Sequence, residues 1–168
     1  MAWVARVRES MARLTPRFSA NRAVREYTHR YYLPATAAYR ERAADRGAKG
    51  AHLVEWRCAL ETGWSNVRFG EVTATTSGEE RLFEVQVYLG SLDPEGVRLE
   101  LYADEEGGGD AIQLEMTRGR QLVGAENGYA YSAQVPATRP VSDFTPRLIP
   151  HFPGVAVPLE EVRILWQR

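Results

Sequence analysis

The chain has 168 residues, enough for one ordinary domain or for a small helical piece joined to a β-sandwich. Its hydrophobic fraction of 44% and charged fraction of 26% are typical of a globular protein and exclude a disordered chain. The single cysteine, Cys58, excludes a disulfide framework and a cysteine-rich zinc site. No stretch approaches the roughly 20 apolar residues of a membrane helix, so we expect a cytoplasmic protein with no membrane partner.

The net charge of -1 conceals an asymmetry between the two parts of the chain. Residues 1–62 hold twelve basic and six acidic residues, whereas residues 63–168 hold nine basic and sixteen acidic residues. A basic arm is one signature of a nucleic-acid-binding protein. The arginines are spread around the predicted helices rather than gathered in one tract, which argues against nucleic acid as a partner.

Apolar residues near the N-terminus recur at helical spacing: Val4, Val7, Met11 and Leu14. This stripe, which we call the N-terminal stripe, predicts an amphipathic helix with charged residues on its other faces. We expect Thr15-Pro16 to end that helix, because the residue before a proline is pushed out of the α region.

Three further helices are predicted before the pattern changes. Ser19 is a suitable N-cap for a helix reaching Leu33, and Pro34 suits the first turn of the next one. Gly47 and Gly50 are expected to break that helix. The last helix carries an apolar face and a glycine as C-terminal cap: Leu53, Trp56, Leu60 and then Gly63.

From Val67 onward the apolar period changes from 3.6 to 2, which predicts strands. The alternating runs cover 83–89, 97–103, 112–116, 129–135 and 162–166, and clusters of turn residues separate them. One face of each strand is apolar and the other polar, as in antiparallel sheets with a solvated side. We therefore predict an α+β chain, with a helical segment over 1–64 and an antiparallel immunoglobulin-like β-sandwich over 65–168.

A search for catalytic chemistry finds no complete site. Gly107-Gly108-Gly109 is interpreted as a hairpin loop, because no Gly-Lys-Ser/Thr follows it. The acidic residues around it do not have the spacing of an EF-hand loop: Asp104, Glu105, Glu106 and Asp110. The histidines are far apart in sequence: His29, His52 and His151. We therefore predict no catalytic, cofactor-binding or metal-binding residue in this chain.

Three aromatic residues are candidates for contact with a sugar chain. Tyr88 and Tyr102 fall on the polar faces of their strands, and Trp64 lies at the junction between helices and strands. Sugars stack on exposed aromatic rings because the C–H groups of one sugar face meet the π-cloud. The alternative is that the two tyrosines cover the seam between sheet and helices.

The first third of the sequence resembles the C-terminal end of the catalytic core of alpha-glucan phosphorylases, the glycogen and maltodextrin phosphorylases. The similar residues fit a Phe-Ser-x-x-Arg-x-x-x-Glu-Tyr pattern: Phe18, Ser19, Arg22, Glu26 and Tyr27. Ala23 departs from it, since a bulkier apolar residue is common there in the bacterial branch. The continuation Tyr31-Tyr-Leu-Pro-Ala35 resembles the bacterial branch with a C-terminal extension. Looser similarities follow at 89–97, 100–102 and 150–153 and near Trp166.

The resemblance implies a parent enzyme, a glycosyltransferase of carbohydrate metabolism that releases glucose 1-phosphate from an α-1,4-glucan by phosphorolysis. It also implies pyridoxal phosphate bound to a lysine in a Gly-Thr-Ser-x-Met-Lys-type motif of the full-length enzyme. Lys49 lies in Gly-Ala-Lys-Gly and is not that lysine. We expect the chain alone to be inactive and to pack against an upstream phosphorylase catalytic core, with a structural or glucan-positioning role.

Two alternatives remain open from the sequence. One is a free-standing carbohydrate-binding module whose ligand is an α-1,4-glucan. The other is an interaction or nucleic-acid-binding protein that uses the basic helices, and this reading predicts salt-sensitive binding.

Overall fold

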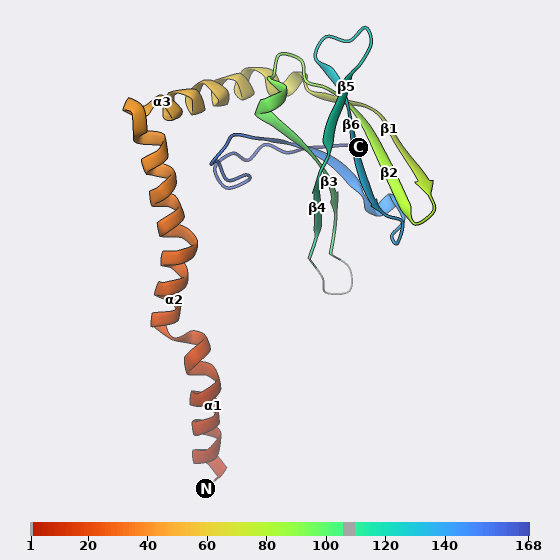
Figure 1. The fold of residues 1–168 in the computed structure, drawn as a ribbon. Coiled ribbons are helices and arrows are strands. Elements are labelled where there is room, and N and C mark those ends of the chain that lie inside the picture. The colour runs from red at the N-terminus through yellow and green to blue at the C-terminus, as the bar shows by residue number, and fades with distance from the viewer. Residues whose placement is uncertain (1, 106–109) are drawn as a thin grey trace. The chain divides into compact units, whose positions relative to one another are not determined.

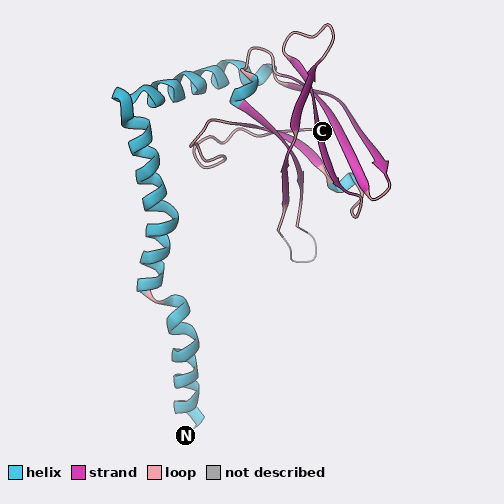
Figure 2. Cartoon of the chain, in the orientation of Figure 1, coloured by secondary structure: helices cyan, strands magenta, loops and turns pink. Residues whose placement is uncertain are grey.

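The computed structural model describes residues 2–105 and 110–168, and it divides into two compact units, Met1–His52 and Leu53–Arg168 (Figure 1). Helices come first and two antiparallel sheets follow, so the prediction of an α+β chain is confirmed (Figure 2). The predicted hairpin loop at Gly107–Gly109 lies outside the described residues. No helix in the described part of the chain is long and apolar enough to cross a membrane.

The first unit consists of helices joined almost without interruption. They are α1 (Ala2–Phe18), α2 (Ala20–Tyr27), the π-helical turn η1 (Thr28–Tyr32) and the first part of α3 (Leu33–Gly63). Ser19 caps α2 as predicted, because its backbone is extended and its hydroxyl accepts a hydrogen bond from the Arg22 N–H at 3.3 Å.

The prediction that Pro16 ends the first helix is wrong, because α1 continues through it to Phe18. A proline two residues from the end of a helix removes only one backbone hydrogen bond, and the helix closes with the turn that contains it. Pro34 lies in the first turn of α3, as predicted, but α2 and α3 are not separated. The π-helical turn joins them, with the Leu33 N–H donating to the Thr28 carbonyl, and this wider turn accommodates the proline ring.

The predicted break at Gly47 is present as a kink inside α3. Asp45, Arg46 and Gly47 have φ of 50°, 58° and 82°, in the left-handed region that glycine enters most easily. Gly50 is helical, so the break is made by the residues before it. Residues 53–63 of α3 belong to the second unit.

None of the described residues in the first unit is buried. Isolated helices of this length are marginal in water, and helices in proteins owe most of their stability to tertiary packing of an apolar face. The first unit therefore lacks the interior that normally stabilises its helices.

The second unit contains two four-stranded antiparallel sheets. The first has the order β1 (Arg68–Ser77), β2 (Glu80–Tyr88), β6 (Gly128–Pro136), β5 (Thr117–Gln121). The second has the order β4 (Ile112–Glu115), β3 (Val97–Ala103), β7 (Thr145–Pro150), β8 (Leu165–Trp166).

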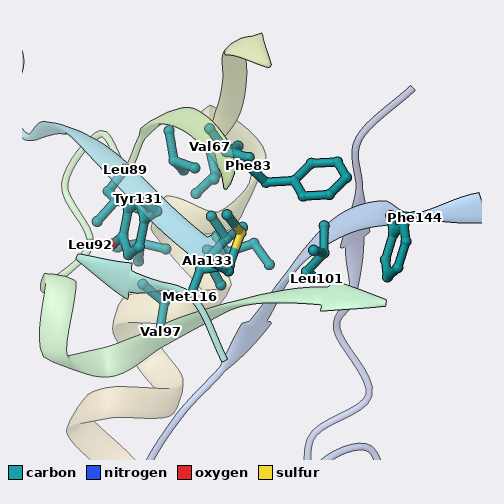
Figure 3. Packing of buried hydrophobic residues seen from close by; sticks show 14 of the residues in the cluster. Val67, Phe83, Leu89, Leu92, Val97, Leu101, Met116, Tyr131, Ala133 and Phe144 are labelled. Atoms are coloured by element: carbon teal, nitrogen blue, oxygen red, sulfur yellow. The ribbon is translucent and has the colours of Figure 1, made fainter. Parts of the chain in front are cut away.

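One hydrophobic core lies between the two sheets. The inward-facing residues of β2 and β3 are those that the period of two predicted, and all are buried: Phe83, Val85, Val87, Val97, Leu99, Leu101 and Ala103. Phe83 and Phe144 approach with ring centroids 5.4 Å apart (Figure 3). Leu60 of α3 is 1% exposed, so the end of this helix belongs to the same core.

The predicted strand through Val162, Ile164 and Trp166 is wrong in its extent. Only Leu165 and Trp166 pair with β7, and Val162 is 76% exposed. The buried Glu161 carboxylate accepts hydrogen bonds from the backbone N–H and the guanidinium of Arg163. This local turn takes the place of the extended backbone that the alternating pattern predicts.

We predict that Leu60→Ala lowers the free energy of unfolding of the sandwich by about 2–5 kcal/mol, because it leaves a cavity in a closed core. Urea unfolding of the full chain, followed by tryptophan fluorescence, measures this change. Val54→Ala on the exposed side of the same helix serves as control and is expected to change stability by about 0.5 kcal/mol or less. Equal effects of the two substitutions would show that α3 is not part of the core.

Candidate functional site

The aromatic residues that the sequence singled out do not lie in one place. Tyr88 is on β2 and Tyr102 on β3, so the two belong to different sheets, and each points away from the core on the outer side of its own sheet. Trp64 lies in the short 3-10 turn η2 (Trp64–Asn66) and packs partly buried against the core. One short sugar segment therefore cannot stack on all three.

Tyr88 is held against the surface of its sheet. The Arg68 guanidinium lies 4.0 Å from the centroid of the Tyr88 ring. Gly70 and Gly128 make room for the ring, since a Cβ at either position would lie 2.9–3.1 Å from its carbons. Tyr88 also lines a hollow of about 490 Å³ beside the loop at Val123, but one of its ring faces is occupied by Arg68.

Around Tyr102, on the outer face of the β4-β3-β7-β8 sheet, several polar and aromatic side chains interact with one another. The register places Glu100 opposite Arg147, and Arg147 opposite Trp166. The Nε and Nη2 atoms of Arg147 donate to the Glu100 carboxylate at 2.9 and 2.7 Å, and Nη2 also donates to Gln113 Oε1 at 3.1 Å. We call these residues and Tyr102 the Arg147 cluster.

Two aromatic rings flank the guanidinium of this cluster. Arg147 lies 4.6 Å from the centroid of the Tyr102 ring and 5.3 Å from that of Trp166. The Tyr102 and Trp166 rings meet edge to face with centroids 5.3 Å apart. Trp166 is 38% exposed, which leaves part of its ring open to a ligand.

The hydroxyl of Tyr102 donates to Asp104 Oδ1 at 2.9 Å. This hydrogen bond stabilises the protonated phenol and raises the pKa of Tyr102 above its ordinary value. The cluster thus offers a neutral phenol, a paired arginine and carboxylate, an amide and an indole. Such groups bind sugar hydroxyls and sugar C–H faces, and they include no nucleophile activated by a base.

The described residues contain no cluster of metal ligands, and Lys49 is paired with a carboxylate. No group of three or more His, Cys, Asp or Glu side chains in residues 2–105 and 110–168 could hold a metal ion. The amine of Lys49 pairs with the Glu41 carboxylate. Both residues belong to the first unit, in which no described residue is buried. These surroundings do not fit a cofactor held as a Schiff base in an enclosed pocket.

The helices present a second candidate surface. Large apolar side chains are exposed along them: Trp3, Val4, Met11, Leu14, Phe18, Val24, Tyr27, Tyr31, Tyr32, Leu33 and Tyr39. Within this set Met11 is 63% exposed and Phe18 is 75% exposed. Exposed apolar side chains that gather on a surface are typical of sites of contact with another protein.

Comparison with known proteins agrees with the sequence motifs. The chain is 26% identical over 164 residues to glycogen phosphorylase of Mycobacterium tuberculosis, an alignment that covers 92% of the chain and 19% of that relative. The glycogen phosphorylase of Mycobacterium bovis gives the same values. Maltodextrin phosphorylase of Thermococcus litoralis is 28% identical over 133 residues, covering 77% of the chain and 16% of the relative. No protein-family model matches the chain.

These similarities confirm the resemblance to glycogen and maltodextrin phosphorylases. The chain spans about a fifth of the length of these relatives, so the greater part of each has no counterpart here.

We predict that Arg147→Met lowers the free energy of unfolding by about 2–3 kcal/mol, because it leaves the nearly buried Glu100 carboxylate without its partner. Urea unfolding of Arg147→Met, Glu100→Gln and the double variant measures the coupling, which is expected to be about 1 kcal/mol or more. The control is Arg120→Met at an exposed position of β5. A coupling near zero would mean that the cluster is a loose surface pair.

Proposed function

We propose that this chain is the C-terminal, non-catalytic portion of an alpha-glucan phosphorylase, with a structural or glucan-positioning role. The observation that carries the proposal is the absence of any buried side chain among the described residues of the first unit, together with its many exposed apolar ones. Helices of this kind need a partner surface. The similarity to phosphorylases about five times as long as the matched region supports a phosphorylase catalytic core as that partner.

In this proposal the catalysed reaction takes place in the rest of the enzyme. Phosphorolysis of the α-1,4-glucan, and the pyridoxal phosphate that the parent family uses, would reside in the catalytic core. Lys49 is engaged by Glu41, and the Arg147 cluster contains no activated nucleophile. This chain would then contribute packing and substrate contact. The exposed free thiol of Cys58 supports a reducing compartment, and we propose the cytoplasm.

We further infer that the sandwich is immunoglobulin-like. Taken in chain order as strands A, B, C, C′, D, E, F and G, the two sheets read A-B-E-D and C′-C-F-G. This order supports the immunoglobulin assignment, since it repeats the arrangement of strands A, B, E and D facing strands C, F and G.

Native capture of a tagged chain from cells of its source organism tests the docking proposal. We expect phosphorolysis of α-1,4-glucan, measured as release of glucose 1-phosphate, to co-purify with the unmodified chain. Met11→Glu is expected to reduce the captured activity about tenfold or more, because it buries an unpaired charge in the interface.

The matched control for this capture is Ala12→Glu, next in sequence but off the N-terminal stripe, because successive residues of a helix lie about 100° apart around its axis. It is expected to retain most of the activity. Capture of the unmodified chain without phosphorolytic activity, or equal activity with both variants, would contradict docking through the N-terminal stripe.

A free-standing carbohydrate-binding module is the second candidate, and the exposed Trp166 ring of the Arg147 cluster favours it. We predict that Trp166→Ala weakens binding of the full chain to soluble maltodextrins by about fivefold or more, as measured by calorimetry. Trp3→Ala on α1, another exposed tryptophan (75% exposed), is the control and is expected to leave binding unchanged. Equal affinity of Trp166→Ala and the unmodified chain would remove the cluster as a glucan contact.

A further inference from the structure

A hollow of about 500 Å³ lies at one edge of the sandwich, where the chain crosses from β4 of one sheet to β5 of the other. The crossing residue Met116 is tied to β3, since its N–H donates to the Leu99 carbonyl at 2.8 Å. Val97, Leu99 and Met116 supply apolar surface to the hollow, and all three are buried (Figure 3 labels Val97 and Met116). Its size is that of ordinary small-ligand pockets.

The hydroxyl of Tyr131, which lines this hollow, has no acceptor for its proton among the described residues. Tyr131 is 4% exposed, and no hydrogen bond to its oxygen has full hydrogen-bonding geometry. The Arg118 guanidinium lies near enough to act on the oxygen as a weak donor and to lower the pKa, but it cannot accept the hydroxyl proton. Burial outweighs this effect and raises the pKa of Tyr131, so the hydroxyl keeps its proton and remains a donor. A buried hydroxyl without a partner is destabilising, and a bound ligand that pairs with it offsets this cost.

The rim of the hollow carries charges that neutralise each other. Arg98 Nε lies 3.1 Å from Glu115 Oε2, and Arg118 pairs with Glu95. His151 Nε2 lies 3.4 Å from Arg98 Nη2. Burial, and then the charge of Arg98, lower the pKa of His151, so its ring is neutral at pH 7.

This arrangement selects the class of ligand. A phosphate or carboxylate would have to displace a glutamate from its arginine, and a cation would have to displace an arginine from its glutamate. A neutral ring with several hydroxyls accepts from guanidinium groups and donates to carboxylates without breaking either pair. Its C–H face suits the apolar side chains of Val97 and Met116, which line the hollow.

We propose that this hollow binds a neutral polyhydroxylated ring, a sugar of one or two units, with the Tyr131 hydroxyl as a direct hydrogen-bond donor. This site is separate from the Arg147 cluster. Trp166 contacts Tyr102 and Arg147, and neither of these residues lines the hollow. The choice of a glucose-based ligand rests on the proposed function, whereas the hollow and its unpartnered hydroxyl do not.

The test is a titration of the isotope-labelled full chain with maltose, followed by NMR of backbone amides. We expect saturable shifts at Thr117, Arg118 and Tyr131. Tyr131→Phe is expected to weaken binding about fivefold, the effect of losing one hydrogen bond. Because the hydroxyl has no partner in the free protein, the same variant is expected to keep or raise the Tm. Tyr88→Phe, on the outer face of the same sheet and outside the hollow, is the control for both measurements.

Three outcomes would overturn the proposal. The first is the absence of chemical-shift changes at these amides with maltose up to about 50 mM. Even weak binding, with a Kd of about 50 mM, would be detected at this concentration. The second is saturable binding of inorganic phosphate at the hollow in place of maltose. The third is a lower Tm for Tyr131→Phe with unchanged affinity, which would give the hydroxyl a structural partner. Failure of activity capture leaves these shifts unaffected, so this inference and the docking proposal fail independently.

Discussion

Burial of apolar side chains is divided unequally between the two units, and the rest of the structure follows from this division. Residues 53–168 close a core of leucine, valine and phenylalanine side chains from both sheets, into which Leu60 of α3 is inserted. The described residues before Leu53 bury nothing. Because helix propensity and capping alone give marginal helices, α1 and α2 need surface from outside their own unit. The proposed phosphorylase core would supply that surface.

The same inward packing decides what the sandwich can present outward. With Leu99, Leu101 and Leu148 fixed in the core, the alternate residues of β3 and β7 must face away from it. Glu100 and Arg147 therefore meet across the ladder and hold the rings of Tyr102 and Trp166 beside them. At the edge of the sandwich, residues of both sheets line the hollow that Tyr131 and its hydroxyl border. In the account proposed above, both surfaces bind neutral hydroxylated ligands.

Local rules predicted the features that depend on near neighbours in sequence. The period of two found β2, β3 and β6, and the Ser19 cap and the kink at Gly47 follow from single residues. The Arg147 cluster could not be predicted in this way, since Arg147 and Glu100 are 47 residues apart and only strand pairing joins them. The apolar periodicity predicts a longer strand than β8. It contains no information on the local hydrogen bond between Glu161 and Arg163, which replaces the first part of that strand by a turn. Proline usually ends a helix, but Pro16 lies in the last turn of α1, where its disruption of backbone hydrogen bonding is small.

Hydrogen–deuterium exchange of the isolated 168-residue chain tests the central claim most directly, because it measures helix stability residue by residue. If the helices have no interior of their own, amides in residues 2–43 will exchange at close to the rate of an unfolded chain. Amides of β2, β3 and β6 will exchange orders of magnitude more slowly, at rates set by global unfolding of the sandwich. Slow exchange throughout α1 and α2 in a monomeric sample would contradict the account, since the helices would then be stable without a partner surface.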